Sequence, residues 1–289
     1  MTGVGHFVSA EAQETYLRLY DVTVMGIPGL RESLDVSTTY GRVRVYRYGA
    51  DDGEPIVLLH GRAGTTVMWE QNIPELASTH PVYAIDVLGE PGRSAQTVPI
   101  RSSAEQAVWL NETLAGLGLE KAHVAGVSGG AWLAFNLALH APERISSLAL
   151  VEPANVFARF AWRFLLGGFA LVPGLPDGVG TRYLQWVAGG VPIEQPAGRL
   201  VMAGLRDYRM KLPMPTYGND DALRSIRLPV LALLGGRSVV HNPLEAARRA
   251  QTLLPDNQTE LWPEAGHGLP AEFPEEFNAR LLKFVAERG

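Results

Sequence analysis

The chain of 289 residues contains no cysteine. This absence excludes disulfide bonds, thiolate zinc sites and a cysteine nucleophile together. Long runs of one charge are also missing, because acidic and basic residues are mixed along the chain, with a net charge of −5. Nucleic acid and membrane surfaces are therefore not expected partners. We expect a small-molecule substrate as the partner, and the sequence indicates no particular oligomeric state.

Apolar segments suited to targeting or membrane insertion are missing too. The first 20 residues carry His6, Glu11 and Arg18 and no apolar stretch of signal-peptide length. The most apolar stretch, residues 157–175, is interrupted by Arg159 and is too short to span a bilayer. We therefore expect a cytoplasmic protein.

Short apolar runs alternate with longer helical patterns along most of the chain. This alternation predicts an α/β fold with a mostly parallel sheet and helices on both faces. A hairpin is expected around Tyr40-Gly41. The expected strands are residues 34–39, 42–48, 55–59, 82–85, 122–127, 145–151, 230–234 and 258–262, and the expected helices are 102–117, 131–140, 243–254 and 272–287.

One segment breaks the alternation, since no strand is predicted between residues 151 and 229. It is rich in Phe, Trp, Leu, Gly and Pro. Long segments inserted between two strands of a compact domain are usually functional, so we predict a helical lid rather than additional helical packing. The expected organisation is an N-terminal helical extension (1–33), a core (34–152 and 223–289) and an inserted helical cap (153–222).

A tight glycine-flanked turn follows the predicted strand 122–127. Its sequence is Gly126-Val127-Ser128-Gly129-Gly130, and a helical pattern follows directly. Such a strand-to-helix turn exposes the serine hydroxyl and forces its backbone into a strained conformation that needs small neighbours. It also places the N–H of Gly129 at a helix N-terminus, where negative charge is stabilised. We predict that Ser128 is a nucleophile; the alternative is a glycine-rich turn with an incidental serine.

A serine nucleophile needs a base, and histidine suits this role near neutral pH. Of seven histidines, only His267 lies in a Gly-His-Gly loop between the last strand and the last helix. We predict that His267 is the base. The turn that starts at His60-Gly61 follows another strand, and we expect the N–H of Arg62 to bind the same oxyanion as Gly129. His60 itself is expected to form structural hydrogen bonds.

From about residue 34 to its end, the chain resembles the α/β-hydrolase superfamily, and within it bacterial carboxylesterase-like members with a helical cap. The order and approximate spacing of four motifs carry the resemblance. They are His60-Gly61-x-x-Gly64, Asp86-x-x-Gly89-x-x-Gly92-Arg93-Ser94, Gly126-x-Ser128-x-Gly130 and Gly266-His267. The resemblance implies an α/β-hydrolase fold and a Ser–His–acid triad.

The sequence departs from this family at the acid. The usual position follows the strand ending near residue 234, but Ser238 occupies it. Some superfamily members place the acid one strand earlier, where this chain has Glu152. Glu152 is therefore the candidate catalytic acid; the alternative is a carboxylate that caps the first turn of the lid. Asp86 is a weaker candidate, expected to organise the loop at residues 89–94.

These features predict a serine hydrolase that cleaves a carboxylic ester or lactone through an acyl-enzyme, without cofactor or metal. Aromatic residues of the cap either line the cleft, which would favour an apolar or bulky acyl group, or pack within the cap. Ser238 raises one rival hypothesis, a non-hydrolytic cyclase or lyase. A third hypothesis is a ligand-binding pseudo-enzyme. The aromatic and apolar cap residues are Phe157, Phe160, Trp162, Phe164, Leu165, Phe169, Tyr183 and Trp186.

Overall fold

A nine-stranded sheet forms the centre of the described structure. This computed structural model describes residues 3–49, 51–171, 177–192 and 195–288. The strand order is β11-β10-β8-β7-β4-β5-β3-β2, with β6 paired to β3. Neighbours from β11 to β5 are parallel, whereas β3 pairs antiparallel with β5, β2 and β6. The strands are β2 (Leu30–Thr38), β3 (Gly41–Gly49), β4 (Ile56–Leu59), β5 (Pro81–Ile85), β6 (Ala95–Gln96), β7 (Ala122–Val127), β8 (Ile145–Val151), β10 (Val230–Gly235) and β11 (Asn257–Trp262).

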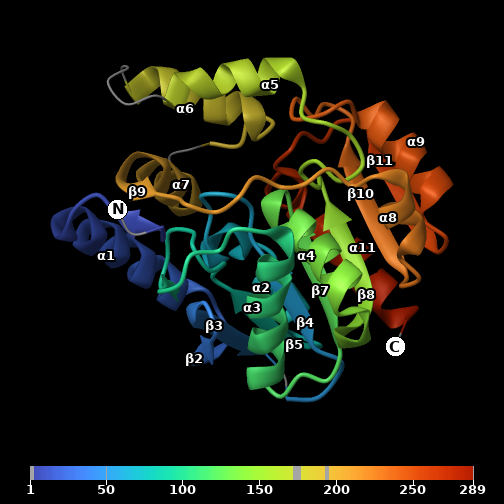
Figure 1. The fold of residues 1–289 in the computed structure, drawn as a ribbon, viewed down its shortest axis with the longest axis horizontal. Helices are drawn as coiled ribbons and strands as arrows, with labels where there is room; N and C mark the ends of the chain where they lie inside the picture. The colour runs from blue at the N-terminus through green and yellow to red at the C-terminus, as the bar shows by residue number, and fades with distance from the viewer. Residues whose placement is uncertain (1–2, 50, 172–176, 193–194, 289) are drawn as a thin grey trace.

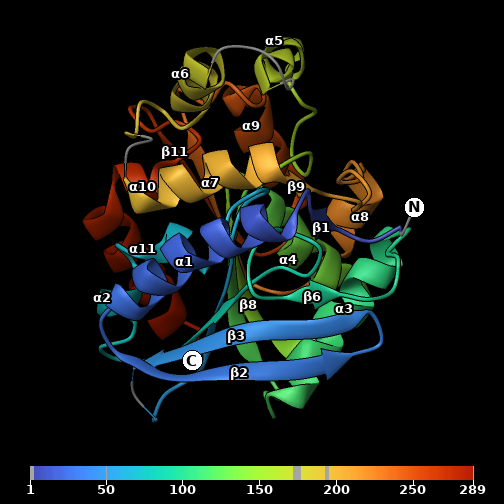
Figure 2. The same ribbon diagram turned by 90° about the vertical axis from the view of Figure 1, so that its left-hand side faces the viewer.

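Helices cover both faces of this sheet (Figure 1 and Figure 2). One core cluster joins the sheet to α3, α4 and α9, and the other joins it to α1, α2 and α11. Strand β4 is buried along its whole length because its side chains alternate between the two clusters. The predicted mostly parallel sheet with helices on both faces is confirmed. The helices are α1 (Ala10–Gly26), α2 (Ile73–Leu76), α3 (Ser103–Gly116), α4 (Gly129–His140), α8 (Asp220–Ser225), α9 (Pro243–Leu253), α10 (Leu269–Glu272) and α11 (Pro274–Ala286), with 3-10 turns at Thr66–Trp69 and Pro142–Arg144.

A separate helical layer lies over one end of the sheet. The chain leaves the sheet after β8, forms α5 (Trp162–Gly167), a 3-10 turn (Gly168–Leu171), α6 (Asp177–Val187) and α7 (Pro196–Asp207), and returns at β10. Figure 1 shows α5 and α6 outermost, with α7 between them and the body of the protein. We call α5, α6 and α7 the cap helices. Residues 172–176 and 193–194 of the predicted cap lie outside the described residues.

Two expectations about this architecture are wrong in detail. A strand does occur between residues 151 and 229: β9 (Tyr208–Arg209) pairs antiparallel with β1 (His6–Phe7). Its two residues are too short to give a periodic signal in the sequence, and the pairing partner lies at the far N-terminus. The predicted helix 272–287 is broken at Phe273, which leaves helical geometry (φ −136°, ψ 62°) directly before a proline.

Candidate active site

The backbone of Ser128 is strained at the turn between β7 and α4. Its φ is 54° and its ψ is −113°, a conformation that is unusual for a residue with a side chain. No side chain fits at either flanking glycine, because an added Cβ would clash with neighbouring backbone atoms. A Cβ on Gly126 would lie 2.4 Å from the carbonyl carbon of Gly130, and one on Gly130 would lie 2.1 Å from the Leu59 oxygen. The sharp turn therefore fixes the backbone from which the serine side chain projects.

The structure brings His267 to this hydroxyl from the loop between β11 and α10. The Nε2 atom of His267 lies 2.8 Å from Ser128 Oγ. The other ring nitrogen, Nδ1, lies 2.9 Å from Glu152 Oε2. An ionised carboxylate only accepts hydrogen bonds, so the proton belongs on Nδ1 and Nε2 is free to accept the serine proton.

Glu152 follows β8 directly and is completely buried. Its Oε1 accepts a hydrogen bond of 2.7 Å from the N–H of Gly235. Its Oε2 accepts one of 2.5 Å from the hydroxyl of Ser238, in addition to that of His267. Ser238, which occupies the usual position of the acid, thus acts as a hydrogen-bond donor to an acid that comes from the neighbouring strand. Helix α5 begins only at Trp162 and its N-cap has no side-chain hydrogen bond, so Glu152 does not cap it.

The surroundings of Glu152 favour its charged form. Burial raises the pKa of this carboxyl, but the hydrogen bond from His267 and the nearby His241 outweigh burial, and the pKa lies below its ordinary value. His241 Nε2 lies 3.7 Å from Glu152 Oε1. Burial lowers the pKa of His241. Sequence reasoning gave His241 no role, since no motif distinguishes it from the other histidines.

The two predicted oxyanion donors lie beside each other. A Cβ on Gly129 would be 3.4 Å from the backbone nitrogen of Arg62. Neither N–H donates a hydrogen bond to another described residue. The turn at Arg62 continues into Ala63, whose φ is 57° and whose N–H donates 2.9 Å to Glu90 Oε2. The two free N–H groups are therefore available to a bound oxyanion.

His60 and Asp86 hold the surrounding loops instead of facing Ser128. His60 donates from Nδ1 to the oxygen of Gly61 (2.8 Å) and accepts at Nε2 from the N–H of Val87 (2.9 Å). Burial lowers the pKa of His60, which favours this neutral form. Asp86 accepts hydrogen bonds from Tyr20 Oη (2.6 Å), the Arg93 N–H (2.8 Å) and Thr66, so it organises its loop as expected.

A cavity of about 420 Å³ lies between Ser128 and the cap helices and is mostly apolar. Both Ser128 and His267 line it. The predicted cap aromatics occupy three kinds of position. Phe164 and Tyr183 line this cavity, Trp162 and Phe169 are 64% and 67% exposed, and Phe157 is buried in the core. Further lining residues from the cap helices are Leu165, Leu184, Val187, Ala197, Val201 and Leu205.

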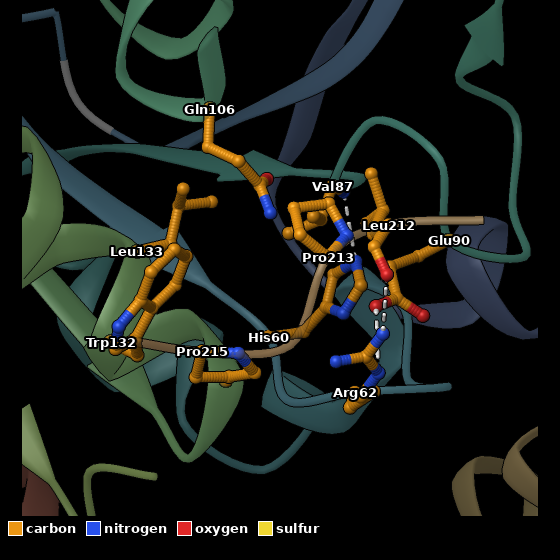
Figure 3. A pocket seen from close by; sticks show the side chains of 11 residues that line it. His60, Arg62, Val87, Glu90, Gln106, Trp132, Leu133, Leu212, Pro213 and Pro215 are labelled. Atoms are coloured by element: carbon orange, nitrogen blue, oxygen red, sulfur yellow. Dashed lines mark hydrogen bonds and ion pairs between the residues drawn. The ribbon is translucent and has the colours of Figure 1, made fainter. Parts of the chain in front are cut away.

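A second, much smaller cavity of about 30 Å³ lies beside the predicted oxyanion donors, and Figure 3 shows its lining. Arg62 lines both cavities, and Gly129 lines the small one. Among the described residues there is no cluster of three or more side chains suited to hold a metal ion. In the same part of the chain, no helix has the length and apolar character needed to cross a membrane.

Comparison with known proteins places this chain in a family. The sequence pattern of the alpha/beta hydrolase fold family matches residues 54–174. A protein of Bacillus subtilis (strain 168), described as "Uncharacterized carboxylesterase nap", is 32% identical over 283 residues, which cover 95% of this chain and 93% of that protein. The chain belongs to the α/β-hydrolase family. The resemblance inferred from the four ordered motifs is therefore confirmed.

A second relative of this α/β hydrolase and a solved structure have similar descriptions. "Carboxylesterase YbfK" of the same bacterium is 30% identical over 288 residues, 96% of each chain. The crystal structure of "naproxen esterase (carboxylesterase NP)" from Bacillus subtilis has a TM-score of 0.89 and 30% identity, and covers 96% of this chain and 99% of that one. The protein is thus a carboxylesterase-like member of the family.

Proposed function

We propose that this α/β hydrolase cleaves carboxylic esters, lactones included, through an acyl-enzyme on Ser128. One observation carries the proposal: Ser128 and His267 line the large cavity, and a continuous chain of hydrogen bonds joins them to the buried Glu152. The carboxylesterase descriptions of the relatives support the same reaction. In this proposal, residues 153–222 act as the cap that closes the cavity over the substrate.

Acylation begins when Ser128 Oγ attacks the carbonyl carbon of the ester and passes its proton to His267 Nε2. The carbonyl oxygen becomes an oxyanion, which accepts hydrogen bonds from the N–H groups of Arg62 and Gly129. Glu152 stays ionised and stabilises the positive charge that forms on His267. The tetrahedral intermediate then collapses: its bond to the alkoxy oxygen breaks, and His267 donates the proton to the departing alcohol.

Deacylation repeats these steps with water. His267 Nε2 takes a proton from a water molecule, and the hydroxide oxygen bonds to the acyl carbon. The bond from that carbon to Ser128 Oγ breaks, and the proton returns from His267 to the serine. The products of an ester are one carboxylic acid and one alcohol, those of a lactone a single hydroxy acid, and the enzyme regains its starting state.

The large cavity supports an apolar or bulky substrate. Its side chains from the cap helices are mainly Leu, Val, Ala and aromatic residues, which bind hydrocarbon and aryl groups by excluding water. Its polar positions, which include Gln71 and Gln195, are few. We therefore propose that the larger, apolar half of the ester occupies this cavity.

The test is a panel of p-nitrophenyl esters of increasing chain length, assayed with the wild type and Ser128→Ala. We expect wild-type turnover and a loss of kcat by a factor of about 10³ or more in the variant. A fluorophosphonate probe should label wild-type Ser128 with one-to-one stoichiometry. Turnover that survives Ser128→Ala would support a cyclase or lyase reaction, and tight ligand binding without labelling or turnover would support a binding protein.

A further inference from the structure

The small cavity lies close to the site of ester attack. Arg62 and Gly129, whose N–H groups we assign to the oxyanion, are part of its wall. Its volume of about 30 Å³ exceeds the roughly 10–15 Å³ needed to hold one water molecule, so it accepts a small functional group. Its other walls include Leu212 and Pro213. His60 and Trp132 also line it, but their ring nitrogens already have hydrogen-bond partners, so Gln106, Arg62 and Glu90 remain as the sites for hydrogen bonds.

Gln106 is the first of these polar side chains. It lies on α3, is 4% exposed, and points its amide into the cavity in Figure 3. Within the described part of the chain, this amide makes no side-chain hydrogen bond. Because the cavity leaves this amide accessible, its donor and acceptor are open to water or to a polar group that enters the cavity.

Arg62 and Glu90 provide the other two polar side chains of the small cavity. The Arg62 guanidinium contacts the sulfur of Met210 (2.8 Å) and the oxygen of Leu212 (3.4 Å), and its Nε lies 4.0 Å from Glu90 Oε1. A thioether is a weak acceptor, so this guanidinium has hydrogen-bonding capacity to spare. Because Glu90 Oε1 and the Arg62 guanidinium lie 4.0 Å apart, the cavity wall offers an acceptor oxygen beside N–H donors, which suits a neutral group that both donates and accepts.

The position of His267 indicates which half of the ester would enter. The departing alkoxy oxygen must take its proton from His267, which lines the large cavity and is not part of the wall of the small one. The alcohol half therefore lies on the side of the large cavity. A substituent in the small cavity must belong to the acyl half.

We infer that the small cavity binds a hydroxyl group on a short acyl chain, so that the preferred substrates are esters of short hydroxy acids with bulky apolar alcohols. A hydroxyl both donates and accepts, which matches the amide of Gln106 and the guanidinium of Arg62. This inference rests on the proposed ester hydrolysis and adds the chemical class of the substrate.

The test uses two pairs of benzyl esters that differ only by a hydroxyl in place of a methyl group. The pairs are benzyl glycolate with benzyl propionate, and benzyl 3-hydroxypropionate with benzyl butyrate. For each pair, kcat/KM of the hydroxy ester is divided by kcat/KM of its partner. We expect Gln106→Leu to lower this ratio roughly tenfold for at least one pair, since one buried hydrogen bond is lost. Comparing enzymes cancels the intrinsic reactivity of the esters.

Two further variants keep the test decisive. Arg62→Met retains the backbone N–H and should also lower the ratio, so a failure of Gln106→Leu to fold would not end the test. Gln195→Leu makes the same exchange in the wall of the large cavity and should leave the ratio at the wild-type value. Thermal melting monitored by circular dichroism checks that each variant is folded.

The outcomes separate the inference from the function on which it rests. Hydrolysis of all four esters with a ratio that neither Gln106→Leu nor Arg62→Met changes would overturn the hydroxyl site and leave ester hydrolysis intact. A preference for benzyl hemimalonate over the hydroxy esters would overturn it in favour of an anion site. No turnover of any ester, together with no labelling of Ser128, would overturn both proposals.

Discussion

Two buried glutamates lie on opposite sides of the Ser128 region and have opposite ionisation behaviour. Glu152, on the side of His267, receives hydrogen bonds from Gly235, Ser238 and His267, and its pKa is lowered despite complete burial. Glu90, on the side of Arg62, accepts one backbone N–H and lies 4.0 Å from a guanidinium; burial raises its pKa to about 7. The number of close donors, more than burial, decides which carboxylate keeps its charge.

The difference between the two glutamates fits the task that we propose for each. On the His267 side, a positive charge forms during catalysis, and a permanent negative charge beside it lowers the energy of that state. On the Arg62 side, negative charge develops on the oxyanion, and a second full negative charge nearby would oppose it. Glu90 is suited to hold the turn at Ala63 through one hydrogen bond without a full charge.

The largest expected effect comes from removing the charge of Glu152. Glu152→Gln should lower kcat by about 10³ to 10⁴, since the equivalent change in a serine protease costs about 10⁴. Ser238→Ala is the matched control: it removes one of three donors to Glu152 and should lower kcat by less than about tenfold. Steady-state kinetics on one ester measures both. Equal and small losses would mean that the enzyme works with Ser128 and His267 alone.

A smaller effect is expected on the other side of the site. Glu90→Leu removes the acceptor of the Ala63 N–H and leaves the Arg62 guanidinium without its carboxylate, so the oxyanion turn should loosen. We expect kcat to fall by about 10- to 100-fold with a smaller change in KM. Glu90→Gln retains an acceptor oxygen and should lose much less.

Binding of a trifluoromethyl ketone, which forms an oxyanion on Ser128, tests whether a loosened oxyanion turn causes the loss of kcat in Glu90→Leu. It should weaken in Glu90→Leu in parallel with kcat, whereas binding of the product acid should not. If KM rises and inhibitor affinity is unchanged, Glu90 shapes the substrate cavity and not the oxyanion turn.

Sequence reasoning was strongest where burial is uniform. The strands Ala122–Val127 and Ile145–Val151 have the predicted bounds, because a parallel strand covered on both faces is a continuous apolar run. The turn at Ser128 is recognisable for a different reason: the backbone packs so closely there that only glycine fits beside the serine. Both kinds of signal lie within a few neighbouring residues.

Interactions between distant segments were beyond the same reasoning. Glu90 contacts Ala63 across 27 positions of the chain, and β9 pairs with the N-terminal β1; neither contact has a local pattern. The role of Glu152 stayed open between catalysis and capping, since the choice depends on where the loops that carry Ser238 and His267 lie. Those positions come from the packing of β10 and β11 beside β8.

The smallest expected effect concerns the free energy of unfolding, to which the two glutamates contribute with opposite dependence on pH. Since the folded protein holds the Glu90 proton up to about pH 7, while the ordinary pKa is 4.5, the folded state binds more protons between these values. Stability should therefore fall as pH rises from 4.5 to 7, by up to about 3 kcal/mol from this group. Glu90→Gln should remove that fall. Glu152 has the opposite sign: its lowered pKa gives stability above pH 4.5 that is lost as pH falls further.

Urea denaturation of the wild type and Glu90→Gln at pH 5 and pH 8 measures the predicted difference, because other titrating groups cancel between the two proteins. The wild type should lose more stability than the variant on going to pH 8. Identical losses would show that Glu90 ionises at its ordinary pKa inside the folded protein. The guanidinium of Arg62 would then neutralise a full charge on Glu90, and the contrast between the two glutamates would disappear.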